Sequence, residues 1–295
     1  MSSTRKRRPA SRTQVIRRVV QAAFAAFILV ASLRHNLLGE SASTASIDAL
    51  CPFGGIETLW RFVTEGQYVP KTHPSNLVLV IGFAIGAVVM GGAFCGWICP
   101  FGSVQDLLTW ARTKLRLPEL RVPARADRWM RYLRFISLAF ILYKTISTVK
   151  LHFADYDPYR TLFGLGWAFE FNLSEQWLAY TVTLVVLVLS FFVPRFWCKY
   201  TCPFGAVQSL LGHLSLVRIK RNPSTCRGCA VCNKPCPVGI NVAEASPRVS
   251  TNCIGCLACL EACPVNGVLE ARLAPSWWDR MVALFGRARR AETTR

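Results

Sequence analysis

Acidic residues are scarce in this chain of 295 residues, where 16 Asp and Glu stand against 35 Lys and Arg and the formal net charge is +19. An excess of this kind can indicate a nucleic-acid-binding protein. Here, however, the basic residues collect at the N-terminus, between residues 112 and 134, and in the last third, next to apolar runs. Membrane topology explains that distribution, so we predict a membrane partner and no nucleic acid.

The haem-attachment pattern Cys-x2-Cys-His is also missing, which excludes a c-type haem, although the chain has 13 cysteines. Hydrophobic residues make up 52% of the sequence and charged residues only 17%. This composition indicates a membrane protein rather than a soluble one. So many cysteines are unusual in a cytosolic chain unless they hold metal.

Eight cysteines form two runs of the pattern Cys-x2-Cys-x2-Cys-x3-Cys-Pro, at residues 226–237 and 253–264. In bacterial ferredoxins the fourth cysteine of each run binds the other cluster. A zinc site would need only four ligands, and disulfides do not suit a cytosolic location. We therefore predict two [4Fe–4S] clusters. One is assigned Cys226, Cys229, Cys232 and Cys263. The other is assigned Cys236, Cys253, Cys256 and Cys259.

Four apolar runs, at residues 19–33, 77–94, 135–149 and 177–193, predict four transmembrane helices. The first run could also be a cleavable signal peptide, but the internal repeat described next favours a retained helix. Basic residues flank the runs on alternate sides. The positive-inside rule therefore places both termini in the cytoplasm and residues 34–75 and 150–176 outside. The expected location is the inner membrane of a bacterium.

An internal repeat links the two halves of the apolar region. The stretch from Cys95 to Leu108 recurs from Cys198 to Leu211, with Cys-x3-Cys-Pro-Phe-Gly-x-Val-Gln-x-Leu-Leu in both. Two helix hairpins with the same orientation are expected, and such parallel repeats commonly pack about an axis along the membrane normal.

Packing the two repeats together could bring four thiols into one group. These are Cys95, Cys99, Cys198 and Cys202. Four thiolates around one point suit zinc, Cu(I) or an iron–sulfur centre, so we predict a shared redox or metal role. The alternative is that they are small packing residues at helix ends. The remaining cysteine, Cys51, is expected on the outer side, where it could be an extra ligand, a reactive thiol or a structural residue.

The predicted fold is an α-helical membrane protein with four transmembrane helices in two parallel hairpin repeats and a C-terminal cytoplasmic 2[4Fe–4S] ferredoxin domain of bacterial type. The expected segments are a basic cytoplasmic N-terminus at 1–18, repeats at 19–114 and 131–214, the ferredoxin domain at 218–272 and a basic amphipathic tail at 273–295.

The helix layout, the paired Cys-x3-Cys-Pro elements and the double cysteine run together resemble the NapH and MauN type of membrane ferredoxin, a family related to the C-terminal half of NosR. The resemblance extends from the first helix to Pro264. It implies an electron-transfer subunit rather than a stand-alone enzyme. Such a subunit passes electrons between the quinol pool and a partner redox system. The alternative is an assembly or regulatory factor that handles a metal or senses redox state through its cysteines.

A quinol site would need a proton acceptor, because a quinol gives up two protons with its two electrons. His35, His73 and His152 fall near the outer helix ends, and histidine titrates near physiological pH. We regard them as candidates for this role. The alternative is that they are polar residues of the membrane interface.

Overall fold

The computed structural model describes residues 12–38, 52–66, 74–120, 122–148, 153, 156–169, 172–245 and 249–273. Cys51, His73 and His152 lie outside these ranges, as do residues 1–11 and the C-terminal tail from residue 274. The predictions made for them therefore remain predictions.

The chain is mostly helical up to residue 211. The helices are α1 (Arg12–Leu38), α2 (Pro52–Glu65), α3 (Pro74–Met90), α4 (Ala93–Trp97), α5 (Pro100–Lys114), α6 (Ala124–Met130), α7 (Leu133–Thr148), α8 (Pro158–Phe163), α9 (Gly166–Phe169), α10 (Leu173–Phe192), α11 (Phe196–Tyr200) and α12 (Pro203–Leu211). We call this part the helical region. Residues 217–245 and 249–273 form the cysteine-rich module, which has strands β1 (Val217–Arg221) and β2 (Leu269–Leu273), the short helix α13 (Ala258–Ala262) and one 3-10 turn at Val231–Asn233.

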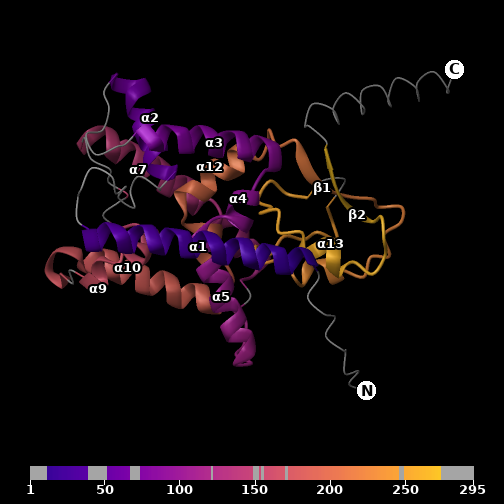
Figure 1. Ribbon diagram of the computed structural model, residues 1–295. Coiled ribbons are helices and arrows are strands. Elements are labelled where there is room, and N and C mark those ends of the chain that lie inside the picture. The colour runs from indigo at the N-terminus through magenta and orange to yellow at the C-terminus, as the bar shows by residue number, and fades with distance from the viewer. Residues whose placement is uncertain are drawn as a thin grey trace.

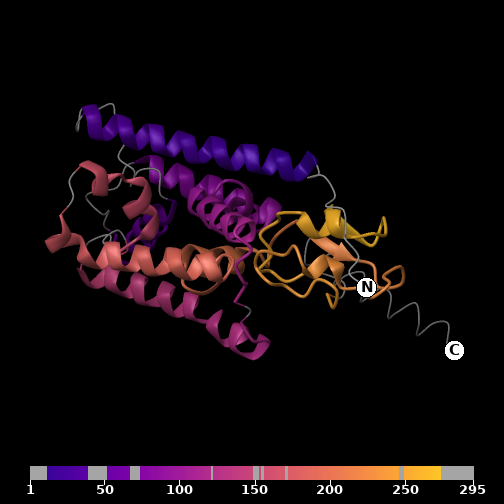
Figure 2. The ribbon, with the colours of Figure 1, turned by 90° about the horizontal axis from the view of Figure 1, so that it is seen from below.

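The two parts lie at opposite ends of the molecule, as Figures 1 and 2 show. Helix α1 extends along the helical region and reaches the module, where the side-chain amide of Gln14 donates to the carbonyl oxygen of Cys256 over 2.8 Å. In the module, β1 and β2 pair antiparallel, with Ile219 opposite Ala271. The start of the module is also tied to α3, because the backbone N–H of Leu216 donates to the Val88 carbonyl at 2.7 Å.

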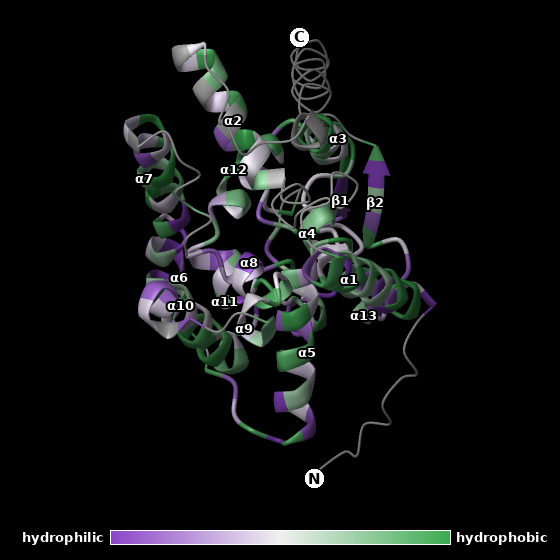
Figure 3. Cartoon of the chain, turned by 60° about the vertical axis from the view of Figure 1, so that its left-hand side comes forward, coloured by the Kyte–Doolittle hydropathy of each residue, from purple (hydrophilic) through white to green (hydrophobic). Residues whose placement is uncertain are grey.

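Among the described residues, two helices, α1 and α10, are long and apolar enough to cross a membrane, and Val78–Met90 of α3 forms a shorter apolar helix. Large apolar side chains point outward from them: Val19 is 63% exposed, Phe27 58% and Leu184 64%. Exposure on this scale indicates a surface that is covered by lipid or by another protein. In Figure 3 hydrophobic residues follow the length of α1, while hydrophilic ones gather around α6 and α8. The prediction of four spans stays a prediction.

The apolar runs at residues 77–94 and 177–193 correspond to α3 and α10, but the Cys-x3-Cys pairs do not lie on these two helices. Helix α3 ends at Met90 and α10 ends at Phe192, and the cysteines begin on separate five-residue helices, α4 and α11. The breaks occur where Gly91 (φ 59°) and Arg195 (φ 53°) adopt left-handed backbone conformations, which end a right-handed helix.

The two repeats pack against each other through aromatic side chains. Phe83 of α3, Phe94 of α4 and Phe204 of α12 form a cluster in which ring centroids are 4.2–5.4 Å apart. Such aromatic contacts add to the stabilisation from burial. Because Phe83 and Phe94 belong to the first repeat and Phe204 to the second, this cluster fixes the repeats side by side.

Candidate iron–sulfur sites

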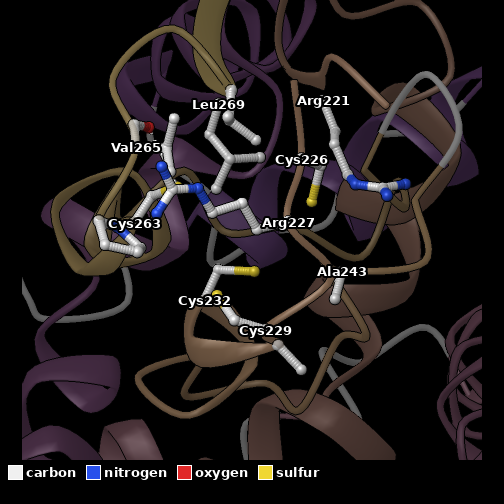
Figure 4. Close-up of a pocket in the computed structure, with 12 residues that line it drawn as sticks. Arg221, Cys226, Arg227, Cys229, Cys232, Ala243, Cys263, Val265 and Leu269 are labelled. Carbon is white, nitrogen blue, oxygen red and sulfur yellow. Dashed lines mark hydrogen bonds between the residues drawn. The ribbon is translucent and has the colours of Figure 1, made fainter. Parts of the chain in front are cut away.

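The first cysteine run of the module forms the wall of a pocket. Cys226, Cys229, Cys232 and Cys263 all line it, together with Arg221 and Leu269 (Figure 4). These are the four cysteines that the sequence pattern assigns to one cluster. Cys263 comes from the second run, so the structure brings the fourth cysteine to the other run's loop, as the pattern predicts.

Local backbone geometry explains how each run curls around a site. Gly228 and Ala230 flank Cys229 with φ of 67° and 52°, and Gly255 and Leu257 flank Cys256 with φ of 60° and 59°. Left-handed residues on both sides of the second cysteine turn the chain tightly, so that successive thiols face one centre. Glycine adopts this conformation without strain, whereas alanine and leucine do not.

The second group is buried more deeply than the first. Burial first, and then the nearby thiols of Cys256 and Cys236, raise the pKa of the Cys253 thiol to about 12. Burial and the thiols of Cys253, Cys256 and Cys236 also raise the pKa of Cys259. The four predicted ligands of the second cluster are therefore neighbours. Thiols in this environment stay protonated at neutral pH unless a cationic group binds them.

Electrostatics differ at the first group. A hydrogen bond from Arg221 is the main cause of a lowered pKa at the Cys226 thiol. Of the four thiols around this pocket, Cys229 is exposed and the other three are partly buried. The first group therefore lies near the surface of the module, and the second lies between the module and the helical region.

No three His, Cys, Asp or Glu side chains converge closely enough for a single metal ion in the part of the chain that the structure describes. A larger group fits the thiols better. The backbone N–H of Ile240 donates to the Cys236 sulfur at 3.3 Å, and hydrogen bonds to sulfur are a regular feature of iron–sulfur sites. Soft thiol ligands in sets of four, with N–H groups aimed at sulfur, match the chemistry of a [4Fe–4S] cluster.

The second cysteine group is held against the helical region by contacts with the backbone of the module. The indole N–H of Trp97 donates to the Gly255 carbonyl at 3.0 Å, and Arg131 donates to the Val238 carbonyl at 2.7 Å. A Cβ atom on Gly92 would lie 2.2 Å from the Cys253 carbonyl oxygen, and one on Gly96 would lie 2.1 Å from that of Ile254. Only glycine permits this approach.

The four cysteines of the repeats are brought together, as the packing argument predicted. Cys202 is close enough to Cys198, Cys95 and Cys99 for their charges to interact, and Cys95 is similarly close to Cys99 and Cys198. We call Cys95, Cys99, Cys198 and Cys202 the thiol quartet. Cys95 is buried and the others are partly buried.

An ion network that the sequence reasoning missed lies beside the thiol quartet. Asp106 accepts hydrogen bonds from Arg195 at 2.7 and 2.8 Å, from Gln21 at 3.0 Å and from Arg17. Arg195 is fully buried and also donates to the Cys95 carbonyl at 2.6 Å. Buried charges persist in proteins when they are paired in this way. The network ties α1, α5 and the turn before α11 together.

A second network links the other repeat to the module. The Asp127 carboxylate accepts from Tyr200 at 2.5 Å and from Arg131 at 2.7 Å, and pairs with Lys199 at 3.1 Å. Burial alone would raise the pKa of Asp127, but the hydrogen bonds from Tyr200 and Arg131 and the charges of Arg131 and Lys199 lower it below its ordinary value. No short motif marks these residues, so sequence inspection could not have found them.

Of the three predicted histidines, the structure describes His35, near the end of α1. Its Nδ1 atom is buried and has no hydrogen-bond partner among the described residues. Elsewhere at these helix ends, the carboxylate of Glu57 is 1% exposed and accepts a hydrogen bond from Thr145 at 2.7 Å. Asp157 caps α8 by accepting from the Tyr159 N–H at 3.0 Å.

Two family descriptions match the chain. A 4Fe–4S binding domain matches residues 72–118 and 176–222, and a 4Fe–4S dicluster domain matches residues 218–264. The first matches the part of each repeat that contains the Cys-x3-Cys pair, and the second covers both cysteine runs of the module. No solved structure matches the chain.

Similar proteins include three with descriptive names. The methylamine utilization ferredoxin-type protein MauN of Methylobacillus flagellatus is 28% identical over 70% of this chain and 68% of its own length. The ferredoxin-type protein NapH of Haemophilus influenzae is 32% identical over 56% of this chain and 55% of its own. The regulatory protein NosR of Pseudomonas aeruginosa is 30% identical over 50% of this chain, which spans only 20% of NosR.

Proposed function

From the premise that the chain belongs to the NapH/MauN-type family of membrane ferredoxins, we propose that it is the quinol-linked iron–sulfur subunit of a membrane electron-transfer system. The cysteine-rich module would hold two [4Fe–4S] clusters, which would supply one-electron transfer. The observation that carries the proposal is the pocket in which Cys226, Cys229 and Cys232 of the first run meet Cys263 of the second.

We propose the same ligand sets that the sequence pattern predicts. The first cluster is held by Cys226, Cys229, Cys232 and Cys263, and the second by Cys236, Cys253, Cys256 and Cys259. Arg221 lies at the first pocket and stabilises negative charge there, since its hydrogen bond lowers the pKa of Cys226. The backbone N–H of Ile240 does the same at Cys236. Bound clusters would supply one-electron oxidation and reduction at these positions.

The way in which the module is attached supports electron transfer from the module toward the helical region. Its second cysteine group lies against Gly92, Gly96 and Trp97, whereas the first group lies near the surface. We propose that the surface group exchanges electrons with a partner redox subunit and that the second group connects to the helical region. With the module in the cytoplasm and both termini inside, the route would lead into the inner membrane.

At the other end of the helices, we propose that Glu57 and His35 take the protons released by a quinol. Both bring a buried polar atom to the helix ends that are expected outside. Carboxylate and imidazole side chains are the groups that most often accept protons as general bases in enzymes. The predicted His73 and His152 belong to the same proposal.

Assembly or regulation is the second candidate. It is favoured by the relative NosR, whose name describes a regulatory protein, and by the number of thiols available for handling a metal. A protein of this kind would hold its clusters without sustained turnover with quinol.

Replacing one module ligand tests the cluster assignment. Cys229→Ser in the full-length protein, purified without air, should lose about 4 iron atoms per chain and one low-temperature magnetic resonance signal, because serine oxygen is a poor ligand for the cluster. The matched control is Ser224→Ala in the same loop, whose hydroxyl donates to the Asn222 side chain at 2.7 Å. Two unchanged cluster signals in Cys229→Ser would refute the ligand assignment.

Quinol oxidation is tested in vesicles that contain the intact protein and a ubiquinol or menaquinol analogue. Glu57→Gln should slow quinol-dependent cluster reduction at least tenfold and leave reduction by dithionite unchanged, since only the proton acceptor is lost. Glu175→Gln, an exposed carboxylate of α10, is the control. If no quinol reduces the clusters of the unsubstituted protein, the assembly or regulatory role is the better one.

A further inference from the structure

The thiol quartet remains unused by this function. Two thiols come from the first repeat and two from the second, and all four lie close enough together for their charges to interact. The 4Fe–4S binding domain description matches residues 72–118 and 176–222 separately, but each of these segments contains only two cysteines. A complete set of four exists only because the repeats pack side by side.

Backbone N–H groups at two helix N-termini lie beside the thiol quartet. Cys99 and Cys202 are the N-caps of α5 and α12, and Pro100 and Pro203 begin those helices. The backbone N–H groups of Phe101 and Gly102 lie close to the Cys99 sulfur, and that of Gly205 lies close to the Cys202 sulfur. Hydrogen-bond donors beside cysteine sulfur are a regular feature of iron–sulfur sites.

Close backbone approach is repeated at both pairs. A Cβ atom on Gly102 would lie 2.9 Å from the Cys95 carbonyl oxygen, and one on Gly205 would lie 3.0 Å from that of Cys198. Each glycine therefore lets the new helix fold back onto the helix that carries the first cysteine of its pair. The geometry is duplicated together with the motif.

Side chains complete the surroundings. The buried amide of Gln105 donates to the Cys198 sulfur at 3.1 Å, and its own oxygen accepts from Ser190 at 3.2 Å, which fixes its orientation. The guanidinium of Arg195 interacts with Cys198, and that of Arg134 interacts with Cys202 and Cys95. Two cations and an oriented donor suit an anionic group bound by four thiolates.

The thiol quartet also borders the module. One pocket is lined by Cys95 and Cys198 of the quartet and by Cys253 of the second cysteine group. The backbone of Cys253 and Ile254 packs directly on Gly92 and Gly96, which flank Cys95. An electron on the second cluster would therefore have the thiol quartet as its neighbour inside the helical region.

We propose that Cys95, Cys99, Cys198 and Cys202 hold a third [4Fe–4S] cluster, shared by the two repeats. This proposal rests on the proposed function in one respect, namely that the second module cluster exchanges electrons with the third cluster. In each transfer one cluster is oxidised by one electron and the other is reduced by one, and the four thiolates remain bound without gaining or losing a proton. The third cluster continues the route from the module into the helices.

Iron counting on the intact protein, purified without air, tests the proposal. Three clusters predict about 12 iron and about 12 sulfide per chain, whereas the module alone predicts about 8 of each. Cys99→Ser combined with Cys202→Ser should lower the iron content by about a third and remove one resonance or Mössbauer component, with the module signals retained. The control is Ser103→Ala, which alters the hydroxyl bonded to the Cys99 carbonyl but keeps every thiol.

A complementary variant keeps the proposal falsifiable if that protein does not fold. Cys229→Ser combined with Cys256→Ser should disrupt both module clusters and leave about 4 iron per chain at the thiol quartet. The proposal is overturned if the unsubstituted protein holds about 8 iron, if zinc is found in place of iron, or if the four thiols prove to be disulfides. Failure of the proposed function looks different, because no quinol would then reduce the clusters of the unsubstituted protein, whatever their number.

Discussion

The two repeats share a sequence and a local geometry, but they support different contacts. Each has a five-residue helix that carries the first cysteine, a second cysteine that caps the next helix, and a glycine three residues further on that allows close approach. The residues between these fixed points have diverged. Gly92 and Gly96 of the first repeat correspond by position to Arg195 and Lys199 of the second.

Because of that difference, the first repeat contacts the module and the second repeat forms the ion pairs. The first presents glycine to the module, so that the Cys253 and Ile254 backbones approach to within a distance no side chain would permit. The second presents cations, and Arg195 and Lys199 pair with Asp106 and Asp127. Duplication preserved the cysteine geometry, while docking and charge pairing were each assigned to one copy.

Substitutions at the equivalent positions 106 and 209 should give the largest difference in unfolding free energy between the two repeats. Asp106→Asn leaves the buried guanidinium of Arg195 and that of Arg17 without their shared carboxylate, which should cost about 3–5 kcal/mol of unfolding free energy. Ser209→Ala loses only a hydroxyl bonded to the Ala206 carbonyl, at about 1 kcal/mol. Thermal unfolding of the full-length protein in detergent measures both. Equal losses would show that the ion network is not a special feature of the first repeat.

Docking of the module depends on the glycines of the first repeat. Gly96→Ala would place a Cβ atom 2.1 Å from the Ile254 carbonyl oxygen, so the module must shift, at a cost of about 1–3 kcal/mol. We expect faster limited proteolysis between residues 212 and 260. Gly86→Ala in α3, where an added Cβ meets nothing within 4 Å, is the control and should not destabilise the protein. Unchanged proteolysis in Gly96→Ala would mean that the module is held elsewhere.

Gln105 and Gln208 occupy equivalent positions in the two repeats. Replacing them should give the smallest effect, which is a change in reduction potential. Gln105 donates to the Cys198 sulfur, whereas Gln208 donates to the Gly91 carbonyl at 2.6 Å. A hydrogen bond to sulfur stabilises the reduced cluster, so Gln105→Leu should lower the reduction potential of the proposed third centre and leave the module potentials unchanged. Gln208→Leu should change neither. A redox titration followed by magnetic resonance measures the shift, and a downward shift in both variants would contradict the asymmetry.

The cysteine motifs could be interpreted from the sequence because their geometry is local. Spacings of three and four residues leave one loop few ways to turn, and the exchange of the fourth cysteine between runs follows from the same pattern. The internal repeat likewise predicted that Cys95 and Cys202 would lie near each other. Family membership is confirmed by the matches to MauN and NapH.

Helix boundaries were less predictable. The hydrophobic runs predicted spans at residues 77–94 and 177–193 but not the short helices α4 and α11, which left-handed residues at Gly91 and Arg195 separate from α3 and α10. Hydropathy carries no information about the backbone dihedral angles of an individual residue. An arginine in that conformation is particularly hard to anticipate, because its hydrogen bonds to the distant Asp106 help to hold it there.

By itself the sequence determined the ligand types, their grouping into two runs and the duplication of the helical part, since these depend on residues close together in the chain. Only the tertiary structure decided which surface of the first repeat receives the module, which carboxylate neutralises Arg195, and that Gln105 rather than Gln208 reaches a sulfur. Those outcomes depend on contacts between residues about 80 to 160 positions apart, where no spacing rule operates. They follow from how closely two backbones can approach and which buried charges must be paired.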